Sequence, residues 1–205
     1  MRFKLLIVVL AALLQTVHGQ NVTNVSSGQK LSSGQIFSPR PSGGGGTTTQ
    51  WLTPNTDGSL RSDNYVVGCS FTMNTTTSAK NLALYVQSGN TLAHNVGLWL
   101  FVNSTTFTYL GSVSVTTSGH GVGYNVVSLG TPITLTSGLT YVILQDMSTG
   151  SDNWFDEEAP TSATSVATVG FSIYSESSWA TLVGNGGSIQ KVTAGWSYCA
   201  PSFGY

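Results

Sequence analysis

The chain has 205 residues, of which 40% are hydrophobic and only 7% are charged. Ordinary soluble domains carry about 25% charged residues, so charge alone does not keep this surface hydrated. Without its first nineteen residues, the chain keeps five cations against eight acids, a net charge near −3. This balance provides no basic surface for nucleic acid, and we exclude that class of partner.

Residues 1–19 have the order of a secretory signal peptide. Arg2 and Lys4 precede the apolar run 5–14, and small residues lead to a cleavage point before Gln20. No later stretch has the roughly 18 consecutive apolar residues that a membrane-spanning helix needs. The sequence therefore predicts a secreted, extracellular protein without a membrane span. A retained N-terminal anchor is the alternative.

The surface also carries signals for glycans, which are bulky and hydrated. Together with a signal peptide, the Asn-x-Ser/Thr sequons predict N-glycosylation in a eukaryotic host. The four sequons lie at Asn21, Asn24, Asn74 and Asn103.

Residues 20–62 are rich in Gly, Ser, Thr and Pro and poor in large apolar residues. A segment of this composition buries too little surface to offset its ordering entropy, so we expect an arm or linker. Its few apolar residues would be anchors on a docking surface. These anchors are Leu31, Ile36, Phe37, Trp51 and Leu52.

The spacing of apolar residues from Asn64 onward predicts short β-strands. Leu82, Leu84 and Val86 share one face, which is the period of a half-buried strand. No segment has a sustained helical period, so almost no helix is expected. The predicted strands span residues 64–73, 80–87, 94–102, 107–116, 122–129, 131–136, 139–146, 164–175 and 196–205.

This pattern predicts an all-β domain over residues 63–205, a single two-sheet β-sandwich. Trp99 points opposite to its neighbours Leu98 and Leu100, toward an outer sheet face or a partner. Pro132 stands at a predicted strand start, where its missing N–H costs least. Alternating positions would supply the core, for example Val113, Val115, Val142 and Leu144.

The two cysteines, Cys69 and Cys199, lie in the first and last predicted strands. In an oxidising compartment they would form a disulfide that closes a loop of about 130 residues, contributing roughly 4 to 5 kcal/mol on the chain-entropy model. The alternative is two unpaired buried thiols. Metal binding has little support because no Cys-x-x-Cys spacing is present.

Several short motifs carry a resemblance to a known group of domains. They are Ser88-Gly89-Asn90-Thr91 with His94 and 96–99, then 131–143, 151–156 and 198–205. In these motifs the chain resembles jelly-roll-like β-sandwich domains of unknown function found in secreted carbohydrate-active and adhesive proteins. The resemblance covers roughly residues 64–205 and implies a non-catalytic module with a carbohydrate connection. An attached enzyme domain is missing from the chain, and the arm is an addition to the pattern.

An acidic loop around Trp154 is the one conspicuous polar constellation. Asp152, Asp156 and Glu157 could supply part of the six to eight oxygen ligands of Ca²⁺, although a solvated acidic loop is the simpler alternative. Trp154 and Phe155 could form a platform on which a sugar ring stacks. In the alternative, Trp154 plugs the end of the sandwich.

Catalysis has little support in the sequence. Adjacent acids on one loop rarely provide the opposed carboxylates of a glycosidase. His94 and His120 lie near no nucleophile motif, and both are expected on the surface or in turns. No cofactor is implied.

We therefore expect a non-enzymatic secreted glycoprotein that is a structural building block of an extracellular coat, matrix or fibre. Self-association would follow when the arm of one copy adds to the sandwich of the next. The alternative is a carbohydrate-binding or adhesive module that uses Trp154, Phe155 and Asp156.

Overall fold

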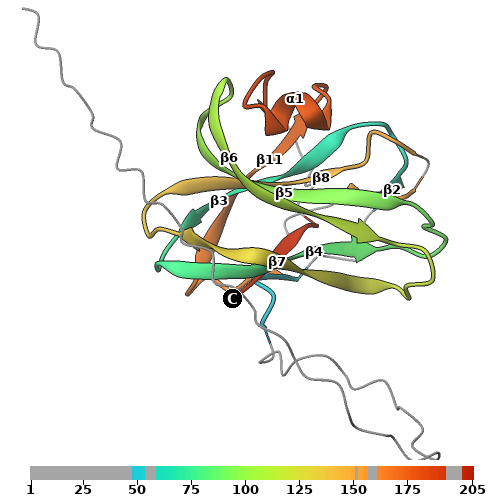
Figure 1. Cartoon of the computed structure of the whole chain (residues 1–205), viewed down its shortest axis with the longest axis horizontal. Helices are drawn as coiled ribbons and strands as arrows, with labels where there is room; N and C mark the ends of the chain where they lie inside the picture. The colour runs from blue at the N-terminus through green and yellow to red at the C-terminus, as the bar shows by residue number, and fades with distance from the viewer. Residues whose placement is uncertain (1–47, 54–58, 151, 157–160, 193–199) are drawn as a thin grey trace, which may run out of the picture. The chain divides into compact units, whose positions relative to one another are not determined.

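The computed structural model describes residues 48–53, 59–150, 152–156, 161–192 and 200–205. All of them belong to one compact unit, Gly44–Tyr205, which is the predicted all-β sandwich (Figure 1). The predicted signal peptide and the arm anchors Leu31, Ile36 and Phe37 lie outside the described residues. Within the described part of the chain, no helix is long and apolar enough to cross a membrane.

The larger sheet is antiparallel and has six strands. In spatial order they are β12 (Gln190–Lys191), β11 (Ala167–Ser175), β3 (Val66–Met73), β8 (Thr140–Asp146), β5 (Ala93–Asn103) and β6 (Thr106–Thr116).

The facing sheet has three antiparallel strands, in the order β13 (Ser202–Gly204), β4 (Thr77–Val86) and β7 (Gly123–Leu135). The chain crosses between the sheets from β3 to β4, β4 to β5, β6 to β7 and β7 to β8, as chains do in Greek-key sandwiches. Two short pairs complete the strands, β1 (Leu52–Thr53) with β10 (Thr161–Ser162) and β2 (Ser59–Arg61) with β9 (Trp154–Asp156).

Strand β7 runs where the sequence predicted two strands, 122–129 and 131–136. Its register against β4 shifts at Lys80, so that Asn81 pairs with Ser128 while Ala79 pairs with Ile133. Pro132 therefore lies in this bulge and not at a strand start. Since a bulge on an edge strand leaves an N–H unpaired, the ring of Pro132 is tolerated there.

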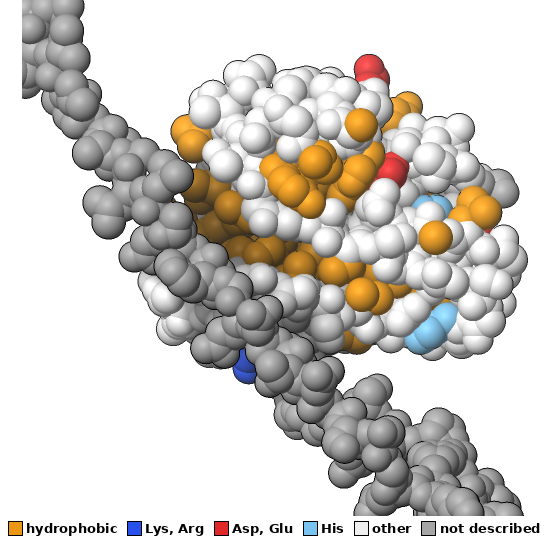
Figure 2. All heavy atoms as spheres, in the orientation of Figure 1, with side chains coloured by type: hydrophobic (Ala, Val, Ile, Leu, Met, Phe, Trp, Pro, Cys, Tyr) orange, Lys and Arg blue, Asp and Glu red, His pale blue; other side chains and the backbone are white. Residues whose placement is uncertain are grey.

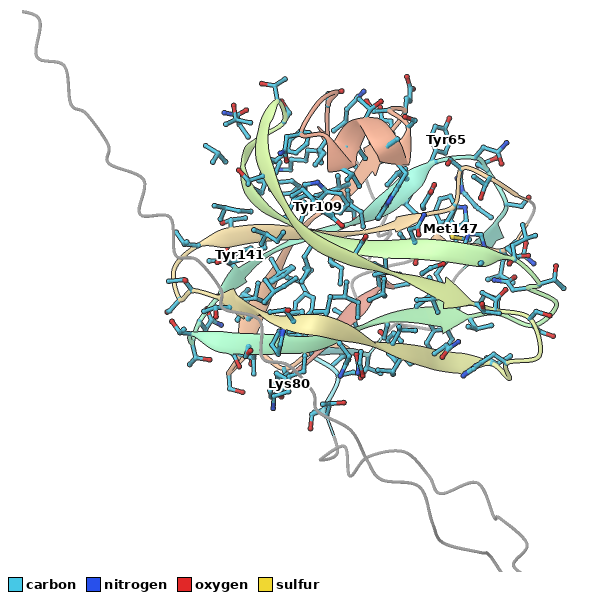
Figure 3. The ribbon with its side chains drawn as sticks, viewed as in Figure 1. Tyr65, Lys80, Tyr109, Tyr141 and Met147 are labelled. Atoms are coloured by element: carbon cyan, nitrogen blue, oxygen red, sulfur yellow. The ribbon has the colours of Figure 1, made fainter. Side chains whose placement is uncertain are left out.

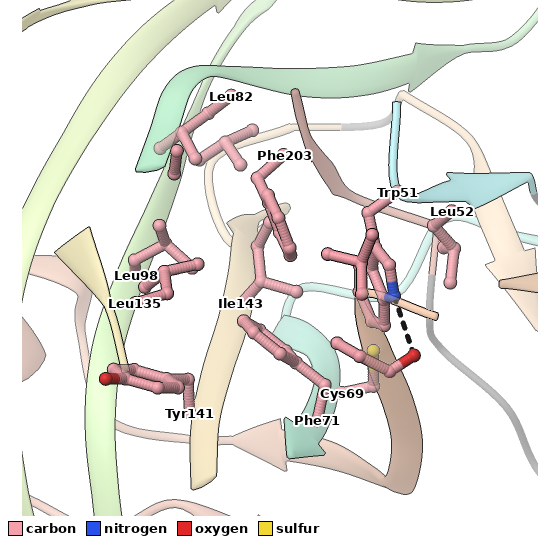
Figure 4. Packing of buried hydrophobic residues seen from close by; sticks show 14 of the residues in the cluster. Trp51, Leu52, Cys69, Phe71, Leu82, Leu98, Leu135, Tyr141, Ile143 and Phe203 are labelled. Carbon is pink, nitrogen blue, oxygen red and sulfur yellow. Dashed lines mark hydrogen bonds between the residues drawn. The ribbon is translucent and has the colours of Figure 1, made fainter. Parts of the chain in front are cut away.

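The main core lies between the two sheets and is centred on aromatic rings (Figure 4). Trp51 stacks on Phe203 with ring centroids 5.2 Å apart, and its Nε1 donates to the carbonyl oxygen of Ala167 at 3.1 Å. Trp51 and Leu52 are 1% and 0% exposed. The predicted arm therefore does not extend to residue 62, because its last two anchors fill the core of their own chain.

A second apolar layer covers the outer face of the larger sheet. Helix α1 (Trp179–Val183) begins after its N-cap Ser178, whose side chain accepts a hydrogen bond from the N–H of Thr181. Beneath it, Trp99 is fully buried and donates from Nε1 to the carbonyl oxygen of Leu182 at 3.0 Å. Trp99 thus faces outward from its sheet, as predicted, and α1 covers it.

The same layer explains why β8 has both faces buried. Val142 and Leu144 pack in the outer layer with Trp99, whereas the alternate residues Tyr141 and Ile143 belong to the main core. All four are therefore buried. Val142 and Leu144, which were predicted for the core between the sheets, lie on the opposite face of the larger sheet.

Candidate functional site

The carboxylate of Asp152 is the centre of a buried hydrogen-bond network at one end of the sandwich. It accepts from the N–H groups of Thr91 and Leu92 at 2.9 Å, and from the hydroxyl of Thr117 at 3.0 Å. His94 Nε2 lies 3.0 Å from the same carboxylate. Since Asp152 is 5% and His94 1% exposed, the pair is shielded from solvent.

His94 is therefore not the surface or turn residue that its sequence context indicated. Its Nδ1 lies 2.8 Å from the carbonyl oxygen of Asp146, which can only accept. The two ring nitrogens thus face two oxygen atoms, the carbonyl oxygen of Asp146 at Nδ1 and the carboxylate of Asp152 at Nε2. Burial by itself raises the pKa of Asp152, but the hydrogen bonds from Leu92, Thr91, His94 and Thr117 outweigh it and lower that pKa.

Two of the motifs that carried the family resemblance, residues 88–94 and 151–156, meet in this network. Asn90 donates from Nδ2 to the carbonyl oxygen of Asn153 and accepts from the N–H of Asn153, both at 2.9 Å. These bonds join the loop between β4 and β5 to the segment before β9. An added Cβ at Gly150 would lie 1.9 Å from Cδ1 of Leu92, so a larger residue there would require the Leu92 side chain to move. The motifs are structural, and the carboxylate of Asp152 is already fully engaged.

The rest of the acidic loop is only partly described. The side chain of Asp156 and the whole of Glu157 lie outside the described residues. Where side chains are described, no three His, Cys, Asp or Glu residues form a group that could hold a metal ion. Calcium at this loop stays a prediction.

Trp154 and Phe155 do not present ring faces to solvent, since they are 3% and 4% exposed. Trp154 packs with Val67 and Met147 and donates from Nε1 to the carbonyl oxygen of Asp63 at 3.1 Å. Phe155 contacts the ring of Tyr85 with centroids 5.4 Å apart. The alternative that Trp154 plugs the sandwich is confirmed.

A hollow of about 310 Å³ is lined by the segment around Asp63, whose carbonyl oxygen accepts the hydrogen bond from Trp154. Its wall combines three charged residues with two tyrosines, although charged residues are rare in this chain. The lining residues are Arg61, Asp63, Tyr65, Val67, Tyr174 and Glu176. Sequence reasoning missed it, because residues 61–67 and 174–176 come together only through the pairing of β3 with β11.

A second feature is the open edge between the two sheets. Strands β6 and β7 are edge strands of opposite sheets, and β6 pairs only with β5 and β7 only with β4 within the described ranges. Partly exposed apolar side chains line this edge against the main core, and Figure 2 shows a recessed hydrophobic strip between the sheets. The apolar residues that β6 and β7 contribute are Leu110, Val113, Val127, Leu129 and Ile133.

This edge carries no charge. No Asp, Glu, Lys or Arg occurs between Lys80 and Asp146, a stretch that includes both edge strands. Natural sheets usually blunt their edges with charged residues, so an uncharged edge is open to pairing with another strand. The sequence shows that this stretch lacks charged residues, but only the strand order shows that two edge strands lie within it.

The predicted glycosylation sites and the predicted disulfide are only partly within the described residues. Asn74 and Asn103 are both exposed, whereas Asn21 and Asn24 lie outside the described residues. Cys69 is fully buried in the main core, on β3. Cys199 is not among the described residues, so its pairing with Cys69 stays a prediction.

The two facing antiparallel sheets, with one short helix among the described residues, define a nearly all-β sandwich. A family model for a domain of unknown function, DUF4082, matches residues 52–196. The chain belongs to this family. No curated protein and no solved structure matches it.

Proposed function

We propose that this protein is a non-enzymatic building block of an extracellular assembly, in which the arm of one copy docks on the β-sandwich of the next. The observation that carries this proposal is the open edge, where the uncharged strands β6 and β7 flank a recessed apolar strip (Figure 2). Secretion, N-glycosylation and the disulfide between Cys69 and Cys199 are parts of the same proposal.

An edge strand presents unpaired N–H and C=O groups that an extended segment can satisfy. The arm offers Leu31, Ile36 and Phe37 as side chains for the apolar strip. An extended chain spans about 3.3 Å per residue, so residues 20–47 reach up to about 90 Å. That length is ample for reaching a neighbouring copy.

The end of the same segment supports this mode of docking. Leu52 and Thr53 pair with Ser162 and Thr161 as a two-residue strand, and Gln50 pairs with Gly204. The ring of Trp51 then fills the core beside Phe71 and Phe203. A few main-chain hydrogen bonds and one buried aromatic ring thus hold residues 50–53 in place, and Phe37 offers the arm a similar ring.

The first test is light scattering on the mature, full-length protein and on a variant that lacks residues 20–43. The deletion ends before the compact unit begins at Gly44, so it spares Trp51. We expect the average mass of the full-length protein to rise with concentration and that of the deletion variant to stay at one chain. Full-length protein that is monomeric at every concentration would end the proposal.

A charged residue on the edge tests the docking surface itself. Ser114 is exposed on β6, and Ser114→Lys should weaken self-association at least tenfold because a lysine on an edge strand disfavours the addition of another strand. Ala180→Lys, on the exposed side of α1, is the matched control and should not change it. Equal association of both variants would place the contact elsewhere.

A mixing experiment separates docking between copies from docking within one chain. The variant without residues 20–43 keeps its open edge, so it should accept the arm of a full-length copy. We expect tagged deletion variant to capture untagged full-length protein. Failure of capture, with full-length protein still associating, would indicate another interface.

Carbohydrate binding is a second candidate function, in line with the resemblance of the motifs. With Trp154 buried, the support comes from the hollow between Arg61 and Glu176, which combines tyrosine rings with carboxylates. This candidate is independent of assembly.

A further inference from the structure

We infer that the hollow lined by Arg61, Asp63, Tyr65, Tyr174 and Glu176 binds a single neutral pyranose residue, such as the terminal sugar of a glycan. This inference deepens the second candidate function and does not depend on assembly. The proposed site replaces the predicted sugar platform on Trp154. Trp154 instead holds the segment that carries Asp63, one of the lining residues.

The two tyrosines form a prearranged aromatic wall. Their rings meet edge to face, with centroids 5.9 Å apart and an angle of 83°. The hydroxyl of Tyr174 donates to Gln190 Oε1 at 2.8 Å, which fixes that ring, while Tyr65 is 36% exposed. Exposed aromatic surface of this kind stacks on the C–H face of a sugar ring.

Hydrogen bonds to its backbone hold the segment that carries Asp63 and Tyr65 in place. Trp154 Nε1 donates to the carbonyl oxygen of Asp63, and the N–H of Met147 donates to the carbonyl oxygen of Tyr65 at 3.0 Å. Strand β2 pairs with β9, with Arg61 opposite Trp154. A rigid wall loses little entropy when a ligand binds, so this support would strengthen the binding of a sugar.

Polar groups suited to hydroxyls lie beside the tyrosines. Arg61 Nη1 and Asp63 Oδ2 are 3.3 Å apart, and both side chains remain partly exposed. Side by side, a guanidinium and a carboxylate offer donors and acceptors to neighbouring sugar hydroxyls. Glu176 is exposed and adds a second carboxylate.

The charges that line the hollow and its volume restrict which ligands can bind there. Two carboxylates against one guanidinium repel acidic sugars. A bare cation is disfavoured as well, because Arg61 already lies against Asp63. A volume of about 310 Å³ is at the small end of ligand pockets, which fits one ring and not a chain of rings.

The test uses the mature full-length protein and a panel of methyl pyranosides of glucose, galactose, mannose and N-acetylglucosamine, with binding measured by saturation-transfer NMR and calorimetry. We expect at least one of them to bind. Tyr65→Ala and Asp63→Asn should each weaken that binding tenfold or more. Lys80→Gln, on the opposite side of the molecule in Figure 3, should leave it unchanged.

Thermal unfolding of each variant checks that the fold is kept. No binding of any pyranoside, or binding that both Tyr65→Ala and Asp63→Asn leave intact, would overturn the inference. Preferential binding of tetramethylammonium would overturn it in favour of a cation cage. None of these outcomes affects the assembly proposal, whose readout is the mass of the protein in solution.

Discussion

Asp152 is the residue on which the end of the sandwich depends most. Asp152→Asn keeps the size of the side chain but faces amide hydrogens toward donors and leaves His94 without its carboxylate. Removing one partner of a buried, hydrogen-bonded pair costs about 3 kcal/mol. We expect a loss of this size in the free energy of unfolding at pH 7, measured by urea denaturation. Asp63→Asn, at an exposed carboxylate, should cost far less.

The same carboxylate sets an acid limit. Its pKa in the folded protein lies below the ordinary value of 3.8, so the ionised group stabilises the fold above that pH. This contribution is lost as the pH falls through the folded-state pKa. As the pH falls below about 4, the free energy of unfolding should therefore decrease more steeply for the parent protein than for Asp152→Asn. Urea denaturation at each pH measures this difference. Parallel curves would contradict this role.

The two described sequons differ in what a glycan would displace. Asn74 donates from Nδ2 to the carbonyl oxygen of Thr164 and to the hydroxyl of Thr168, whereas Asn103 uses only its Oδ1, which accepts from Thr105. Because a glycan replaces one hydrogen of Nδ2, folded Asn74 would lose at least one of these two hydrogen bonds. In protein secreted from a eukaryotic host, mass spectrometry should find higher occupancy at Asn103 than at Asn74. Equal occupancy would mean that folding does not discriminate between them.

At the scale of elements, the short helix α1 stabilises the fold out of proportion to its length. Leu182 is fully buried against the outer face of the larger sheet, and its carbonyl oxygen receives the indole N–H of Trp99. Leu182→Ala should cost about 2 to 5 kcal/mol of unfolding free energy, as buried leucines do. Tryptophan fluorescence should also shift to the red as water reaches Trp99. Ala180→Ser, on the exposed side of α1, is the control and should change neither.

The long strands could be predicted from the sequence because their period of two extends over many residues. Leu82 and Leu84 do share a face in the main core. By contrast, β1, β2, β9, β10 and β12 have only two or three residues each, too few to establish a period. Helix α1 has five residues and no helical repeat, so nothing in the sequence indicated what would cover Trp99.

The candidate sites were harder to predict because they depend on topology. His94 and Asp152 are 58 positions apart, and neither motif shows that their loops meet at one end of the sandwich. Trp51 looked like an anchor for another molecule, since the segment that carries it is rich in polar residues. Only the pairing of residues 50–53 with β13 and β10 places it inside its own domain.

For the whole molecule, the remaining question of stability is how the two sheets are joined. Cys69 is fully buried on β3 of the larger sheet, and Ala200, the neighbour of Cys199, lies buried just before β13 of the smaller sheet. A disulfide between Cys69 and Cys199 would therefore tie the sheets together across the main core. It would constrain the unfolded chain over a loop of about 130 residues and contribute roughly 4 to 5 kcal/mol.

Cys199→Ser should lower the free energy of unfolding by about that amount, measured by urea denaturation without reductant. The double variant with Cys69→Ser distinguishes a bond from two separate thiols. If the bond exists, its stabilisation is lost once, so the double variant should lose much less than the sum of the two single variants. Additive losses, together with two reactive thiols in the denatured parent protein, would exclude the disulfide. The sheets would then be held together without a covalent link, by the main core around Trp51 and Phe203 and by the loops that join them.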